Sequence, residues 1–223
     1  MKNIFTFILC ILAYTVAAQK PLEKEVGDFD EVKVFDLIEI NLIKSNENKV
    51  VITGADTEDV EIINKKGKLK IRMKFDRIFD GSETFVEVYY KDISIIDANE
   101  GAVIVANETM KQPYLKLKTQ EGGKIIASLD VDNLESKAVS GGIIDTSGKV
   151  KHQEITLNTG GIYEGKKLLT EQTKVKVSAG GEAYVSASVL ADARVRAGGY
   201  IEIHGDPETI KKDKLFGGKI KVK

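Results

Sequence analysis

Apolar and polar residues alternate along most of the chain, a pattern typical of β-strands with one buried face. The alternation is clearest on both sides of a repeated glycine pair. The pairs begin at Gly122, Gly141, Gly160, Gly180, Gly198 and Gly217, with a degenerate Gly101-Ala102 ahead of them. Successive pairs are 21, 19, 19, 20, 18 and 19 residues apart. No stretch keeps the 3.6-residue apolar period of a helix over more than two turns.

A unit of about 19 residues is too short for a strand–helix–strand crossover, which needs about 30 residues or more. It suits one coil of a β-solenoid, in which equivalent strands stack in parallel about 4.8 Å apart. We therefore expect an all-β fold, a right-handed parallel β-helix with about 19 residues per coil. The rival interpretation is a set of hairpin turns in an antiparallel barrel. Hairpin turns of that kind favour Asn-Gly or Asp-Gly, whereas the residue before the pair varies here.

The glycine pair would mark one corner of every coil. Either its backbone adopts positive φ, or stacked corners approach too closely for a side chain. Residues 29–95 lack the pairs but alternate in the same way, and "NKKGK" predicts a turn between two strands. We expect one solenoid domain over residues 29–223, with irregular N-terminal strands or a cap at 29–95 and glycine-pair coils at 96–223. A linker at residues 19–28 would precede it.

The N-terminus, "MKNIFTFILCILAYTVAAQ", has a positive start, a short apolar run and small residues before Gln19. This is typical of a secretory signal peptide, here residues 1–18. An uncleaved anchor and a lipoprotein modified at Cys10 are the alternatives, although the apolar run is short for a span of about 20 residues. Cys10 is the only cysteine, so the mature chain would have no disulfide. We expect export to the periplasm or cell surface of a Gram-negative-type bacterium, with no transmembrane segment in the mature chain.

The signal peptide, the alternating strands, the glycine corners and the ending "YIEIHGDPETIKKDKLFGGKIKVK" together resemble the head GIN domain family. Members of that family are described as putative auto-transporter adhesins and occur widely in Bacteroidetes-like bacteria. The resemblance covers roughly Phe29 to Val222. It implies a β-helical exported protein with a role at the cell surface, and it supplies no catalytic residues.

Two patterned outward rows are candidate binding surfaces. Parallel stacking would align a basic row, interrupted by Thr156, that suits an acidic polysaccharide or lipopolysaccharide; its members are Lys118, Lys137, Lys176 and Arg194. A second set, apolar and aromatic, suits glycan stacking or protein docking; its members are Ile143, Ile162, Tyr184 and Tyr200. The competing interpretations are a solvated lysine row and an apolar cluster shielded by a loop or strand. A formal net charge of -1 argues against nucleic acid as a partner.

Catalytic and metal-binding residues are sparse. His152 and His204 are the only histidines and fall on different sides of the coil. Asp145 and Glu164 would be neighbours at the roughly 5 Å separation of a retaining glycosidase, but on a flat face. Calcium-binding β-rolls need a nine-residue repeat with a fixed aspartate, which this chain lacks.

We therefore expect no metal, no cofactor and no enzymatic activity. The leading hypothesis is a non-enzymatic exported β-solenoid, an adhesin or envelope binding protein whose partner is a glycan or an envelope or host surface component. The alternative is a polysaccharide-active enzyme that uses outward carboxylates. The sequence leaves the oligomeric state open.

Overall fold

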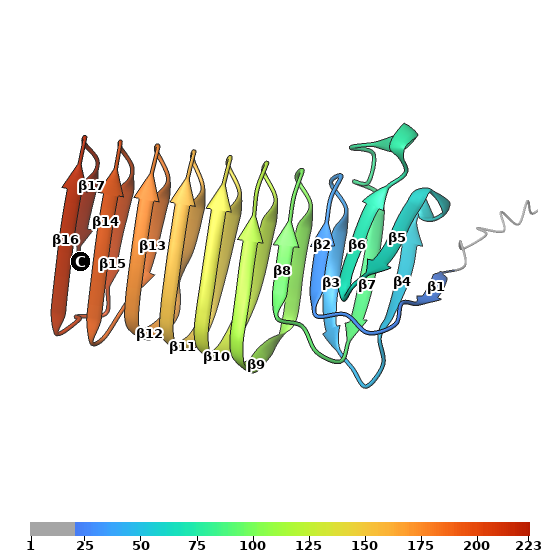
Figure 1. The fold of residues 1–223 in the computed structure, drawn as a ribbon, viewed down its shortest axis with the longest axis horizontal. Coiled ribbons are helices and arrows are strands. Elements are labelled where there is room, and N and C mark those ends of the chain that lie inside the picture. Colours follow the sequence, from blue (N-terminus) through green and yellow to red (C-terminus); the bar gives the residue numbers. More distant parts are fainter. Residues whose placement is uncertain (1–20) are drawn as a thin grey trace, which may run out of the picture.

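The computed structural model describes residues 21–223, and nearly all regular structure in this range is strand (Figure 1). The signal peptide expected at residues 1–18 lies outside the described residues. Two 3-10 turns, η1 (Thr57–Asp59) and η2 (Phe75–Arg77), interrupt the N-terminal part. The strands are β1 (Leu22–Glu25), β2 (Glu31–Val34), β3 (Glu39–Lys44), β4 (Lys49–Gly54), β5 (Val60–Lys65), β6 (Lys68–Met73), β7 (Thr84–Tyr90), β8 (Ile95–Ala98), β9 (Val103–Thr119), β10 (Lys124–Val139), β11 (Ile143–Asn158), β12 (Ile162–Ser178), β13 (Glu182–Ser186), β14 (Leu190–Arg196), β15 (Tyr200–His204), β16 (Thr209–Leu215) and β17 (Lys219–Val222).

The glycine-pair region is a parallel β-solenoid. β9, β10, β11 and β12 pair in parallel along most of their length, so that Lys124 lies opposite Ile143 and Ile143 opposite Ile162. Each of these steps is 19 residues along the chain. The coils follow one another along the long axis of the molecule, as Figure 1 shows. The expected β-solenoid with about 19 residues per coil is confirmed, and the antiparallel barrel is excluded for this region.

Each coil has two straight segments joined by corners. In β9 to β12 one continuous strand covers both segments and bends between them, whereas in the next coils the same path is split into β13 with β14 and β15 with β16. We call the outward side of the segments that follow each glycine pair the leading face. The outward side of the segments that precede the next pair is the trailing face.

The inward side chains form the core. Successive coils stack one column of buried side chains, each at most 1% exposed: Ile104, Ile125, Ile144, Tyr163, Ala183 and Ile201. Four of the six are isoleucine, and each buried Val, Leu or Ile contributes roughly 1.5–3 kcal/mol through loss of apolar surface from water. Because the described chain holds no cysteine, burial and backbone pairing hold the coils together.

Different constraints select the two glycines of the Gly160-Gly161 pair. Gly160 has φ of +71° with open space around its missing side chain, so positive φ alone selects glycine there. A Cβ atom on Gly161 would overlap the carbonyl oxygen of Ala138 in the preceding coil, so close backbone approach selects glycine there. Both reasons expected from the sequence are present, one at each position.

The N-terminal part continues the stack and then changes its pairing. β2 and β3 pair in parallel with β8 and β9, and β6 and β7 pair in parallel with β2 and β3. Beyond them β4, β5 and β1 pair antiparallel with β7, β6 and β4. Lys66 and Gly67 form the expected turn between β5 and β6, with φ of 55° and 77°. β1 lies within the expected linker, residues 19–28, and its four residues pair with β4.

Candidate functional site

The basic row forms one column on the trailing face. The register places Lys118 opposite Lys137, Thr156 between Lys137 and Lys176, and Arg194 next to Lys176. Lys137, Lys176 and Arg194 are exposed, and Lys118 is half-buried. The structure therefore brings these four cations into one line.

Carboxylates occupy both ends of this line. Lys118 Nζ lies 2.6 Å from Asp97 Oδ2, and Asp97 is only 1% exposed. Arg194 forms an ion pair of 2.8 Å with Asp192, which also lines a shallow depression beside Lys176 and Arg194. Among the described residues, ion pairs are found for these two members but not for Lys137 or Lys176. Because half of its charge is paired, the row is a weak attractor for a polyanion.

The apolar and aromatic set divides into two parts on the leading face. Ile143 and Ile162 are direct neighbours, whereas Glu182 separates Ile162 from Tyr200 in the same column. Tyr184 and Tyr200 pack together with ring centroids 5.8 Å apart and planes tilted by 59°. All four apolar or aromatic residues are half-buried. The tyrosine pair, rather than a single four-residue patch, is the distinctive feature of this face.

Polar groups surround the tyrosine pair at hydrogen-bond distance. Tyr200 donates its hydroxyl to Glu202 Oε2 at 2.6 Å, and His204 Nε2 lies 2.8 Å from Glu202 Oε1. Lys166 Nζ lies 4.3 Å from the centre of the Tyr184 ring and 3.6 Å from Glu202 Oε1. We call Lys166, Tyr184, Tyr200, Glu202 and His204 the tyrosine cluster. It combines two aromatic rings with a fixed anion and a cation.

Hydrogen bonding sets the charge states in the tyrosine cluster. The Tyr200 hydroxyl lowers the pKa of Glu202 to about 2, with His204 and Lys166 acting in the same direction against partial burial. The same hydrogen bond, followed by burial, raises the pKa of Tyr200 to about 12. Burial, followed by the hydrogen bond to Glu182, raises the pKa of Tyr184. Glu202 therefore stays ionised and both phenols stay protonated near neutral pH. Proton transfer needs a pKa close to the working pH, so this arrangement suits binding.

The sequence analysis missed three of these residues, Lys166, Glu202 and His204, as parts of a binding surface. Lys166 belongs to the one coil whose glycine pairs are 20 residues apart. The extra residue forms a bulge, because Glu164 pairs with Asp145 while Lys167 already pairs with Ser147. The longer spacing between the glycine pairs at Gly160 and Gly180 was therefore the sequence feature that could have indicated Lys166. The bulge brings the Lys166 side chain over the Tyr184 ring.

The carboxylates Asp145 and Glu164 are direct neighbours in the register of β11 and β12. Burial raises the pKa of Glu164, the charge of Asp145 adds to the effect, and Lys166 opposes it. Neither residue lines the depression beside Lys176 and Arg194 or the groove at the bend of β10, β11 and β12. In the part of the chain that the structure describes, no three His, Cys, Asp or Glu side chains come together as a metal site.

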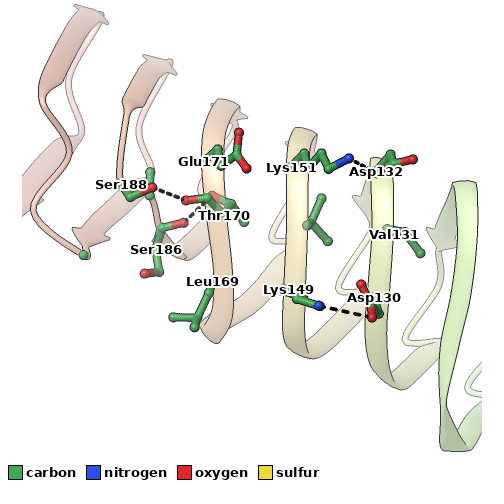
Figure 2. Close-up of a pocket in the computed structure, with 13 residues that line it drawn as sticks. Asp130, Val131, Asp132, Lys149, Lys151, Leu169, Thr170, Glu171, Ser186 and Ser188 are labelled. Atoms are coloured by element: carbon green, nitrogen blue, oxygen red, sulfur yellow. Dashed lines mark hydrogen bonds and ion pairs between the residues drawn. The ribbon is translucent and has the colours of Figure 1, made fainter.

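A groove of about 520 Å³ lies at the bend of β10, β11 and β12. Figure 2 shows two rows of side chains with a floor between them. One row is Asp130, Lys149 and Leu169, the other is Asp132, Lys151 and Glu171, and the floor is Val131, Val150 and Thr170. Because equivalent residues of successive coils make up each row, the groove runs along the stacking direction. We call it the axial groove.

A step between coils closes one end of the axial groove. Glu164 pairs with Tyr184 of the next coil, and Gln172 pairs with Leu190. Between these two pairs β12 has seven residues, 165–171, whereas the next coil has only five, 185–189. The shorter coil leaves Leu169 66% exposed. Ser188 donates its amide to Thr170 O at 2.9 Å, and Thr170 donates its hydroxyl to Ser186 O at 2.5 Å. These bonds fix the closed end.

The matched family model extends over residues 28–207 and is described as putative auto-transporter adhesin, head GIN domain. This chain belongs to that family. The resemblance seen in the sequence is thereby confirmed. No curated protein matches the chain significantly. Among the described residues no helix is long and apolar enough to cross a membrane.

Solved structures share the fold at low sequence identity. A putative adhesin from Bacteroides fragilis superposes with a TM-score of 0.84 at 16% identity, covering 92% of this chain and 96% of the other. A putative adhesin from Parabacteroides merdae gives 0.72 at 17% identity, covering 92% and 95%. A putative lipid binding protein from Parabacteroides distasonis gives 0.72 at 18% identity, covering 92% and 96%. At these identities the similarity establishes only the fold of this head GIN domain chain and says nothing about its function.

Proposed function

We propose that this head GIN domain protein is an exported, non-enzymatic β-solenoid that binds a surface glycan through the tyrosine cluster. In this account residues 1–18 are a cleaved signal peptide and residues 29–223 form one solenoid domain. The protein then works in the periplasm or at the cell surface, and its partner is a glycan of the envelope or of a host surface. The family description and two of the similar structures, both named as adhesins, support a binding role.

The observation that carries the proposal is the geometry around Glu202. Tyr184 and Tyr200 present ring surface and edges on which the apolar face of a sugar packs. The buried Glu202 carboxylate is held by Tyr200 and His204, so its orientation is set before a ligand arrives. A preorganised polar group beside aromatic surface reduces the entropy lost on binding. These features suit recognition of hydroxyl groups more than of a polyanion.

A glycan array tests this proposal. The purified protein is applied alongside a Tyr184→Ala/Tyr200→Ala variant and a matched control, Tyr89→Ala/Tyr114→Ala, that removes two tyrosines elsewhere. We expect the wild type and the control to retain the same glycans and the cluster variant to lose them. If the wild type retains no glycan, or if the cluster variant retains the same set, the proposal is wrong. Circular dichroism confirms that each variant is folded.

The alternative, a polysaccharide-active enzyme, rests on the neighbouring Asp145 and Glu164. Their adjacency and the raised pKa of Glu164 are the features that such a mechanism needs. Neither carboxylate lines the axial groove or the depression beside Lys176 and Arg194, however, and a hydrolase works in a concave site that restricts water. We therefore favour glycan binding over polysaccharide hydrolysis as the function of this protein.

A further inference from the structure

We propose that the axial groove binds a linear, neutral oligosaccharide lying along the stacking direction of the coils. The inference rests on the proposed function in taking a glycan as the ligand class, but it assigns that ligand to a second surface. No residue of the tyrosine cluster lines the axial groove. The two surfaces are nevertheless close in the chain, because Ser186 follows Tyr184 by two residues and Gly205 directly follows His204.

Most charged side chains of the axial groove pair with one another. Lys149 Nζ lies 3.4 Å from Asp130 Oδ2, and Lys151 Nζ lies 2.7 Å from Asp132 Oδ1. The two rows thus satisfy most of their own charge and leave Glu171 as the additional acidic group. A polyanion meets no net positive field here, and a polycation meets only a weak negative one. Both rows still offer ammonium donors and carboxylate acceptors, which are the partners that neutral hydroxyl groups need.

Apolar residues lie between the two rows and on one wall of the axial groove. Val131 and Val150 are each 4% exposed and lie side by side in the register, followed by Thr170. Leu169 adds a large exposed apolar side chain to one wall. A pyranose ring has an apolar C–H face and a rim of hydroxyl groups. Leu169 is therefore the exposed apolar surface on which a sugar ring can pack, and the nearly buried Val131 and Val150 add little to it.

The lining of the axial groove repeats from coil to coil. At each coil at least one of the two rows places a charged group, and the coils are about 4.8 Å apart along the axis. A β-1,4-linked pyranose advances its chain by close to one coil spacing, so successive sugars meet successive coils. Three coils supply the two rows, and the step at Ser186 and Ser188 closes one end. This predicts contact with about three sugars.

Amide NMR spectra of the purified protein, titrated with cellohexaose, test the groove. We expect chemical-shift changes at Val131, Val150 and Thr170. Lys149→Ala/Lys151→Ala is expected to weaken binding about tenfold, because hydrogen bonds from charged donors are lost. Lys137→Ala/Lys176→Ala removes two exposed lysines from the trailing face and is expected to bind as the wild type does. Oligogalacturonate of the same length is expected to bind more weakly than cellohexaose.

Several results would overturn the assignment. Shift changes confined to Tyr184, Tyr200 and their neighbours would refute the groove and leave the proposed function intact. If cellohexaose causes no amide chemical-shift change while the protein binds other glycans on the array, the groove assignment is likewise refuted and the proposed function stands. Equal loss of affinity in both lysine variants would show that general charge, and not the groove, carries binding. Preferred binding of oligogalacturonate would refute the neutral ligand.

Discussion

Gly161 lies so close to Ala138 of the preceding coil that a Cβ atom would overlap the Ala138 carbonyl oxygen. A Cβ atom added to the neighbouring Gly160 would meet no atom within 4 Å, so glycine is selected there by its φ of +71°. We therefore expect Gly161→Ala to destabilise the protein by about 3 kcal/mol or more, because the coils must separate. Gly160→Ala should cost roughly 1–2 kcal/mol, the strain of alanine in the left-handed region. Urea unfolding measures both; equal losses would contradict the two separate roles.

The buried hydroxyl of Tyr163 joins polar groups of two coils. It accepts from Thr146 and donates to Gln153, both at 2.9 Å, and Gln153 donates onward to Thr173 at 2.7 Å. Tyr163→Phe leaves the Gln153 oxygen without this donor inside the core, at a cost of about 1–3 kcal/mol. The control Tyr184→Phe lies on the leading face and should change the free energy of unfolding by about 0.5 kcal/mol or less. A Tyr163→Phe variant as stable as wild type would show that the network is dispensable.

Acid should weaken the fold through Glu202. Its native pKa is lowered to about 2, whereas an unfolded glutamate titrates near 4.3. The unfolded state therefore takes up the proton first as the pH falls. The stabilisation is complete above about pH 5 and is lost between about pH 5 and pH 2. We expect the difference in Tm between wild type and Glu202→Gln to shrink over this range. A difference that stays constant from pH 7 to pH 2 would contradict the assigned pKa.

Asp97 anchors one end of the basic row. Its carboxylate meets Lys118 at 2.6 Å and Lys33 at 3.4 Å, and accepts from Asn99 at 3.1 Å. Asp97→Ala removes all three interactions from a buried position and should cost roughly 1.5–3 kcal/mol. Lys137→Ala, in the same column but without an ion pair among the described residues, should leave the free energy of unfolding nearly unchanged. Chemical denaturation compares the two; similar losses would mean that the Asp97 contacts contribute nothing specific.

The glycine period was enough to predict which residues become neighbours. It placed Lys118 beside Lys137 and Asp145 beside Glu164, and the register agrees. The period did not predict ion pairing within one coil, such as that of Arg194 with Asp192, because side-chain rotamers decide it. The bulge that turns Lys166 outward depends on where a coil absorbs one extra residue, which spacing alone does not locate. The antiparallel β4 and β5 carry no glycine marker, so their pairing was not predictable in the same way.

The axial groove, too, could be predicted only in part from the sequence. The change from a 20-residue to an 18-residue interval is visible in the sequence. Its consequence, a two-residue step that exposes Leu169, follows only once the bend of β12 is known. Length differences between coils thus indicate where a solenoid surface departs from flatness, and the structure shows what lines that place.

The central claim is that the leading face binds glycans without cleaving them. The most direct measurement incubates the protein with immobilised polysaccharides and records both retained protein and released reducing ends. We expect retention without release, loss of retention in Tyr184→Ala/Tyr200→Ala, and wild-type retention in Asp145→Asn/Glu164→Gln. Reducing ends that appear with the wild type and vanish in the Asp145→Asn/Glu164→Gln variant would contradict the claim and establish the hydrolase instead.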